Sequence, residues 1–263
     1  MSTNEAQITQ VPKVKQGKYS DGHPLDTVQY LECKLILKPD RFTSAKAFLE
    51  FGDLVARTAK ESGVGFDNKG VVLKPQIREV LFWDTADFQL YNNAFILRRR
   101  IAYEDGFPTS DPEIVFKFRH PDMQKTADLD LRPGIAGNYR IKFKAEVLPL
   151  KDQVGGYRLL FSHNVQFPFS QAPEQDRTSM PTLARVFPPL ATLKLPDTES
   201  VGLVNQTFVE EVLQDLGVLD FGKGITARPT SPSGASEALI IRCVASLPIR
   251  PSSNAATIFT TRR

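Results

Sequence analysis

Three consecutive arginines, Arg98 to Arg100, stand inside the segment "FILRRRIAY" at 95–103, which otherwise has the apolar character of a β-strand. Side chains alternate between the two faces of a strand, so Arg98 and Arg100 share one face and Arg99 points to the other. Such a strand either has both faces in water or turns one face toward a partner that needs positive charge.

The same alternation of charged and apolar positions occurs in three further predicted strands. "YLECKLIL" at 30–37, "VFKFR" at 115–119 and "YRIKFKAEV" at 139–147 each place charge on one face. The charged positions of the four strands are Glu32, Lys34, Arg98, Arg100, Lys117, Arg119, Arg140, Lys142, Lys144 and Glu146. Basic residues outnumber acidic ones on this shared face, although the whole chain has a net charge of only +3.

Convergent Lys and Arg side chains would neutralise a polyanion such as a phosphate chain, because both groups form charge-assisted hydrogen bonds with phosphate oxygens. The two acids on the same face, Glu32 and Glu146, are of the type that holds a Mg²⁺ or Mn²⁺ ion bridging phosphate oxygens. A simpler interpretation stays open. One face of an antiparallel sheet is commonly solvated, and these charged faces would then be outer surfaces in water.

Five strands and one helix are needed to position these residues. The strands are predicted at 28–37, 78–85, 95–103, 113–120 and 140–148, separated by turns rich in Gly, Pro and Asp. Apolar residues at helical spacing predict a helix in "SAKAFLEFGDLVARTAKESG", with Thr43 or Ser44 as N-cap and Gly63 at its end. We therefore expect a mainly β (α+β) fold, an antiparallel β-barrel tunnel with its charged faces inward and at least one helix packed outside.

The other segments define the expected organisation of the chain. Residues 1–24 are polar and predicted to be disordered or loosely attached, residues 25–228 to form the tunnel domain, and residues 229–263 to be a Pro/Ser-rich, atypical C-terminal tail. The segment 203–224 is compatible with one helix or with two strands around Gly217. Within the tail, "EALIIRCVASLPI" at 237–249 is compatible with one strand.

Composition excludes several classes of protein. The sequence contains no apolar run of the signal-peptide or membrane-spanning type, and we expect a cytoplasmic protein without a membrane partner. Cys33 and Cys243 lie too far apart to indicate a disulfide framework or a zinc motif. His23, His120 and His163 are scattered, so each is expected to be a surface or loop histidine. The weak net charge does not by itself imply non-specific binding to nucleic acid. No sequence-specific nucleic-acid partner is expected, and no oligomeric state is predicted.

Three segments together resemble the CYTH, or triphosphate tunnel metalloenzyme, superfamily. They are "YLECKLIL" at 30–37, "FWDTADFQLYNNAFILRRR" at 82–100 and "VFKFR" at 115–119. That family opens with Glu-x-Glu-x-Lys and continues with a "Tyr-Asp-Thr … Leu … Leu-Arg-x-Arg" segment and a strand carrying a lysine. The resemblance spans about residues 28–147 and, more weakly, 200–228. It implies an eight-stranded antiparallel tunnel that binds triphosphate with a divalent metal and hydrolyses or cyclises it.

By position, the resemblance assigns Glu32 to the second glutamate of the opening motif and Lys34 to its lysine, and both are expected to be catalytic. Arg98 and Arg100 match the paired arginines, and Lys117 matches the strand lysine. Phosphate-binding roles are expected for Lys34, Arg98, Arg100, Lys117, Arg119, Arg140, Lys142 and Lys144, and metal-binding roles for Glu32 and Glu146. The sequence departs from the motif at Tyr30, which replaces the first glutamate and removes one carboxylate from the expected metal site.

Three functions remain compatible with this pattern. The first is metal-dependent hydrolysis, with Mg²⁺ or Mn²⁺, of a triphosphate-bearing small molecule or inorganic polyphosphate. The second is a non-catalytic protein of the same fold that binds a polyanion or phosphate. The third is a structural β protein whose basic faces are solvated.

The segment "GVLDFGKG" at 217–224 is close to a phosphate-binding P-loop, but Gly224 replaces the hydroxyl residue that would hold Mg²⁺.

Overall fold

The structure is a computed structural model that describes residues 17–37, 41–71, 76–150, 152–153, 155–233 and 239–246. Its strands are β1 Tyr30–Leu37, β2 Gly65–Asp67, β3 Gln76–Asp84, β4 Phe95–Glu104, β5 Phe107–Pro108, β6 Glu113–His120, β7 Arg140–Pro149, β8 Tyr157–Pro168, β9 Gly202–Leu203, β10 Val209–Asp215, β11 Val218–Asp220, β12 Thr226–Ser233 and β13 Leu239–Ser246. Its helices are α1 Ala45–Glu61, α2 Gln89–Asn92, α3 Met123–Asp128 and α4 Met180–Val186, with short 3₁₀ segments η2 Phe169–Gln171, η3 Pro188–Leu193 and η4 Val204–Gln206.

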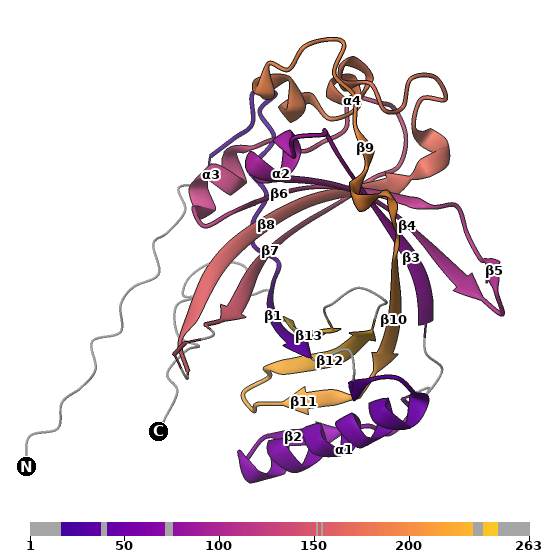
Figure 1. Cartoon of the computed structure of the whole chain (residues 1–263). Helices are drawn as coiled ribbons and strands as arrows, with labels where there is room; N and C mark the ends of the chain where they lie inside the picture. Colours follow the sequence, from indigo (N-terminus) through magenta and orange to yellow (C-terminus); the bar gives the residue numbers. More distant parts are fainter. Residues whose placement is uncertain are drawn as a thin grey trace, which may run out of the picture.

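All the strands belong to one sheet that curls around a central space (Figure 1). Strand pairing runs in the order β10-β3-β4-β6-β8-β7-β1-β13-β12, and because β12 also pairs with β10, the path returns to its starting strand. The mainly β, tunnel-like fold predicted from the sequence is confirmed. Among the described strand pairs, one departs from the expected antiparallel pattern, because β1 runs parallel to β7. The sheet is therefore mixed.

The hydrophobic core lies on the outer side of the curled sheet. Phe95, Leu97 and Phe116 project from β4 and β6 into a cluster with residues of α4 and η3. The rings of Phe116 and Phe187 stack with their centroids 4.4 Å apart. Figure 1 shows α2, α3 and α4 gathered over this side of β6 and β8. The apolar faces of the strands thus pack outward, and the opposite faces turn inward.

Helix α1 confirms the helix predicted between residues 44 and 63. Ser44 is the N-cap, and its hydroxyl accepts a hydrogen bond from the backbone N–H of Ala47. The helix ends at Glu61, and Gly63 follows with a φ of +69°, a left-handed conformation that glycine adopts without strain. In Figure 1, α1 lies along the lower edge of the sheet, beside β2.

Every strand predicted from the sequence is present, as β1, β3, β4, β6 and β7. The segment 203–224 forms strands, β10 and β11, and no helix longer than η4. Gly217 lies between them with a φ of +133°, and a Cβ there would approach the backbone oxygen of Asp67 to 2.7 Å. Strand β13 falls within the segment predicted at 237–249 and pairs with both β1 and β12. The helices in the described part of the chain are all too short or too polar to cross a membrane.

Candidate functional site

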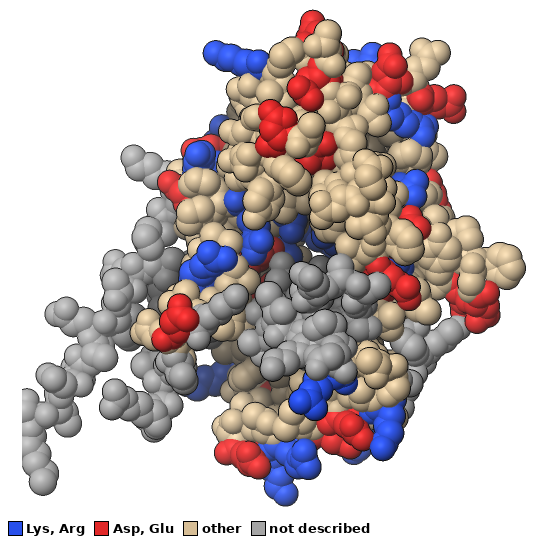
Figure 2. Space-filling model, viewed as in Figure 1, with Lys and Arg blue, Asp and Glu red and all other residues tan. Residues whose placement is uncertain are grey.

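Strand register gathers the charged residues on the inner face of the sheet. Residues that pair across neighbouring strands share a face, and Lys117 pairs with Asn164, which in turn pairs with Lys142. Counting along each strand by twos from these positions places the following residues on this face: Glu32, Arg98, Arg100, Lys117, Arg119, Arg140, Lys142, Lys144 and Glu146. Figure 2 shows Lys and Arg side chains in the hollow at the middle of the molecule.

A pair of buried carboxylates forms the centre of the inner face. Glu32 of β1 and Glu146 of β7 are partners in the parallel strand pair, and both are almost fully buried, with exposures of 2% and 0%. The ammonium group of Lys144 contacts both carboxylates: it donates a hydrogen bond to Glu32 Oε2 and lies 3.2 Å from Glu146 Oε1. We call Glu32, Glu146 and Lys144 the carboxylate–lysine centre.

Two further cations approach the same centre from β6. Lys117 Nζ lies 3.7 Å from Glu146 Oε1, and Arg119 Nη2 lies 2.7 Å from Glu146 Oε2. Lys117 is 5% exposed, so its charge is screened less than that of a surface lysine. Three cationic side chains therefore surround two carboxylates. This local excess of positive charge, away from bulk water, is the main electrostatic feature of the site.

One mouth of the tunnel is a second cationic region. A cavity of about 570 Å³ is lined by residues that include Arg78, Arg100, Glu113, Arg140 and Gln166. Glu113 is the shared acid there: its carboxylate lies 3.9 Å from Arg100 Nη1 and 3.6 Å from Arg140 Nη2. Gln166 Nε2 donates a 2.6 Å hydrogen bond to the same carboxylate. Arg140 is largely exposed at this mouth.

The structure brings most of the residues singled out in the sequence to one face. Arg99 lies on the opposite face, as its position in the strand predicts. Its guanidinium is 3.0 Å from Glu79 Oε1 and packs over the ring of Phe169, 5.8 Å from its centroid. The backbone of Lys34 belongs to β1, but its side chain lies outside the described residues.

Sequence reasoning missed strand β8 and the inner-face residues that it carries. Ser162, Asn164 and Gln166 project from β8 between the basic residues of β6 and β7, and all three are buried. The signal that could have found them is the alternation in "SHNVQF" at 162–167, where Ser, Asn and Gln occupy every second position. Arg78 and Glu113 at the mouth were missed as well.

The side chains of the centre do not fit a divalent metal site in the arrangement described. Mg²⁺ and Mn²⁺ are held by oxygen ligands, and each of the two carboxylates described at the centre already has one oxygen in contact with the ammonium of Lys144. Tyr30, in the place of a third carboxylate, pairs across the sheet with Lys144. Within the described ranges, no group of three or more His, Cys, Asp or Glu side chains lies close enough together to hold a metal ion.

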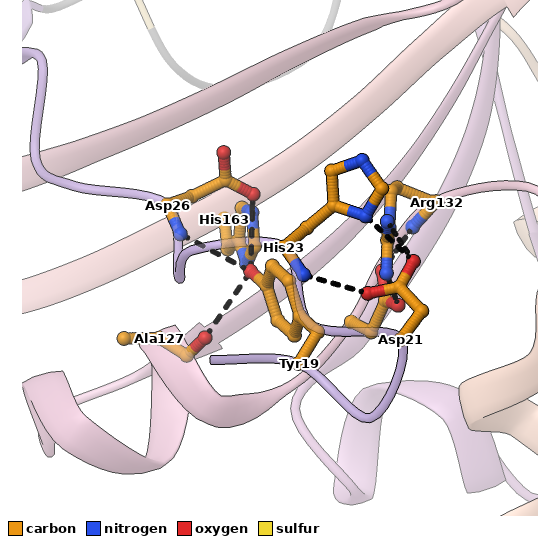
Figure 3. Close-up of polar contacts among 8 residues, drawn as sticks. Tyr19, Asp21, His23, Asp26, Ala127, Arg132 and His163 are labelled. Carbon is orange, nitrogen blue, oxygen red and sulfur yellow. Dashed lines mark hydrogen bonds and ion pairs between the residues drawn. The ribbon is translucent and has the colours of Figure 1, made fainter. Parts of the chain in front are cut away.

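His163 corrects the prediction that each histidine is a surface or loop residue. It belongs to β8, its side chain is fully buried, and it points to the outer side of the sheet (Figure 3). Nε2 lies 3.0 Å from Asp26 Oδ2, and Nδ1 lies 3.2 Å from the carbonyl oxygen of Thr126. The prediction was wrong because β8 itself was not recognised, so nothing placed the residue inside a sheet.

Around His163, an outer polar cluster attaches the segment before β1 to the barrel (Figure 3). We use that name for Tyr19, Asp21, Asp26, Arg132 and His163. The Tyr19 hydroxyl donates to Asp26 Oδ2 at 3.0 Å, and Arg132 pairs with Asp21 and stacks over the Tyr19 ring. Burial raises the pKa of the Tyr19 hydroxyl. Burial alone would raise the pKa of Asp26, but the hydrogen bonds and charges of His163, Tyr19 and Arg132 together outweigh it and hold that pKa below its ordinary value.

Comparison with known proteins gives weak similarities in structure alone. No family model matches the chain, and no curated protein matches its sequence. A solved structure from Hippeastrum, for which a dominant triphosphatase activity is described, is 13% identical, with a TM-score of 0.40 over 82% of this chain and 80% of that one. A candidate adenylate cyclase from Bacillus halodurans is 13% identical, with a TM-score of 0.35 over 82% and 80% of the two chains. A protein from Pyrococcus horikoshii is 11% identical, with a TM-score of 0.34 over 84% and 79%.

Proposed function

We propose that the inner face of the barrel binds the phosphate chain of a triphosphate-bearing small molecule or of inorganic polyphosphate. The observation that carries this proposal is the excess of cations around the carboxylate–lysine centre, where Lys117, Arg119 and Lys144 approach two carboxylates. Arg98, Arg100 and Lys142 extend the same positive surface along neighbouring strands. A linear polyanion carries negative charges repeated along its length, so one molecule can contact cations on several neighbouring strands.

The physical chemistry favours a chain of linked phosphates over a single small anion. Each hydrogen bond between a charged donor and a phosphate oxygen contributes about 1.5–3 kcal/mol, and bidentate arginine contacts add geometric selectivity. Basic side chains from several strands of one barrel are held in place before binding, so little side-chain entropy is lost. Ser162, Asn164 and Gln166 offer neutral polar groups between the cations. As expected from the sequence, we propose that this binding takes place in the cytoplasm.

Metal-dependent hydrolysis of such a chain is the second candidate. The observation in its favour is that Glu32 and Glu146 lie side by side on adjacent strands, buried among the cations that would hold the phosphates. For this candidate, the two carboxylates would have to exchange Lys144 for Mg²⁺ or Mn²⁺. We therefore rank it below binding alone.

One experiment tests both candidates. Isothermal titration calorimetry with tripolyphosphate, with ATP and with sulfate measures whether the tunnel prefers phosphate chains, and a phosphate-release assay in the presence of Mg²⁺ or Mn²⁺ measures turnover. We expect tripolyphosphate to bind at one site and sulfate to bind far more weakly. Failure of both tripolyphosphate and ATP to bind would refute the proposed function. Sustained release of phosphate would make hydrolysis, the second candidate, the function of the site.

A further inference from the structure

The contacts within the carboxylate–lysine centre indicate whether the tunnel needs a divalent metal in order to bind a phosphate chain. We infer that Lys144 is the built-in cation of Glu32 and Glu146, so that the tunnel binds a phosphate chain without a divalent metal. This inference rests on the proposed function. It assigns to the two glutamates a role as positioning residues, which act on the neighbouring cations and do not coordinate an ion.

The first support is the position of the ammonium group. Glu32 and Glu146 are partners across the parallel pair β1–β7, and Lys144 precedes Glu146 by two positions on the same face of β7. Its Nζ contacts one oxygen of each carboxylate. An ion coordinated by both glutamates would have to lie in the space that this group occupies. Lys144 is 5% exposed, so it cannot leave the centre for bulk water without a rearrangement of its surroundings.

The second support is the balance of charge. Among the described contacts, two carboxylates face three cations, since Lys117 and Arg119 also approach Glu146. A divalent ion entering this group would meet repulsion from both of these side chains and would displace Lys144 from its two partners. In a poorly screened interior, such repulsion is stronger than it would be on the surface. The centre already contains the positive charge that a metal would otherwise supply to the phosphates.

The third support is the set of possible ligand atoms. Mg²⁺ is commonly bound through one or two carboxylates together with substrate phosphates, and it needs near-ideal octahedral geometry. Glu32 and Glu146 are enough in number for such a site, but one oxygen of each already contacts Lys144, and Tyr30, two positions before Glu32 on the same face of β1, adds no carboxylate. The glutamates instead have a clear use as they stand: they fix the directions of the ammonium and guanidinium groups toward the space where a phosphate chain would lie.

The test begins with the unmodified protein and two measurements. Titration with Mn²⁺ alone, followed by electron paramagnetic resonance, should show no bound ion, and calorimetry should give tripolyphosphate dissociation constants in EDTA and in Mg²⁺ that agree within about threefold. A stoichiometric bound Mn²⁺ signal that Glu32→Gln abolishes would overturn the inference, whether or not tripolyphosphate binds. Binding of tripolyphosphate that disappears in EDTA would also overturn it, while leaving the proposed function intact.

A matched pair of variants sharpens the test. Lys144→Gln removes the ammonium between the carboxylates, and Arg140→Gln removes a positive charge from the same face of the same strand, where its described acidic contact is Glu113. Both should weaken binding in EDTA. Only Lys144→Gln should gain a bound Mn²⁺ and make tripolyphosphate binding stronger in Mg²⁺ than in EDTA, by about tenfold or more. Equal ratios in the two folded variants would contradict the inference, and the measurements on the unmodified protein decide it if Lys144→Gln does not fold.

Discussion

The carboxylate–lysine centre inside the barrel and the outer polar cluster on its surface use similar residues in opposite balance. In the outer polar cluster, Arg132 pairs with Asp21 and also with the neighbouring Asp130, and His163 contacts Asp26. In the centre, the single carboxylate of Glu146 is approached by three cations, Lys117, Arg119 and Lys144. Matched charges satisfy one another and hold two parts of the chain together. A local excess of one sign among the described residues attracts a ligand of the opposite sign.

This difference in charge balance indicates a structural role for the outer polar cluster and a binding role for the inner face. Like charges held close together inside a protein repel one another, and binding of an anion beside the cations of the inner face would reduce that repulsion. The outer cluster offers no such gain, since its acids and bases are already paired. Variants of the inner face should therefore change ligand affinity, and variants of the outer cluster should change stability.

The largest expected effect comes from the paired arginines of β4. Replacing both, as Arg98→Ala with Arg100→Ala, removes two donors from the inner face, and each charge-assisted hydrogen bond is worth about 1.5–3 kcal/mol. We expect the dissociation constant for tripolyphosphate to rise by roughly a hundredfold or more, measured by calorimetry.

Arg99 provides the control for that double variant. It is their immediate neighbour in β4, but its guanidinium pairs with Glu79 on the outer side of the sheet. Arg99→Ala should leave the affinity for tripolyphosphate unchanged and should lower stability slightly, because a partly exposed ion pair contributes little. Equal losses of affinity in Arg99→Ala and in the double variant would show that the inner face is not the binding surface.

In the outer cluster, His163→Ala should destabilise the fold and spare the ligand. The change removes a fully buried ring that packs against Phe143, and it removes the contacts of that ring with Asp26 and with the Thr126 carbonyl. Lost packing and two lost hydrogen bonds predict a decrease of about 2–4 kcal/mol in the free energy of unfolding. Urea unfolding followed by circular dichroism measures this. A variant with normal stability and weakened tripolyphosphate binding would reverse the roles assigned to the two regions.

The same cluster predicts a dependence of stability on pH in the acid range. Asp26 has a folded-state pKa below its ordinary value of 3.8, because His163, Tyr19 and Arg132 together outweigh the effect of burial. Its contribution to stability is therefore fully present above about pH 4 and is lost as the pH falls through the lowered pKa. Asp26→Asn should be less stable than the unmodified protein at neutral pH, and the difference should shrink below about pH 4. Unfolding curves in urea at a series of pH values measure this, and a difference that grows toward acid would contradict it.

The sequence alone predicted the parts of the fold whose signals are local. The strand alternation in "FILRRRIAY" correctly separated Arg99 from its neighbours, and the spacing of apolar residues with Ser44 as cap correctly predicted α1. Strand β8 was missed because "YRLLFSHNVQFP" begins with adjacent apolar residues, and because its alternating Ser, Asn and Gln resemble a loop. Those residues form a pattern only when the inner face is known to be polar.

The carboxylate–lysine centre lies beyond what such local signals can reveal. Lys144 and Glu32 are 112 residues apart in sequence, and their contact depends on the parallel pairing of β1 with β7. The sequence placed Glu32, Glu146 and Lys144 on charged faces of their strands, but a charged face does not specify its neighbour. The prediction that the two glutamates bind a metal considered each carboxylate separately. That both contact Lys144 depends on the pairing of β1 with β7, which the sequence alone does not reveal.

The smallest expected effect is also the one that best separates binding from hydrolysis. Glu32→Gln preserves the shape of the side chain and removes one negative charge from beside Lys144. If the tunnel only binds phosphate chains, the loss of a repelling charge should leave the affinity for tripolyphosphate unchanged or tighten it by a few-fold, as calorimetry in EDTA would measure. If the protein hydrolyses its ligand with a metal, the same change should abolish metal-dependent phosphate release, while binding partly survives. Weaker binding in EDTA would show that the positioning of Lys144 by Glu32 outweighs the repulsion between Glu32 and the phosphates, because a mobile lysine loses more entropy when it meets the phosphate.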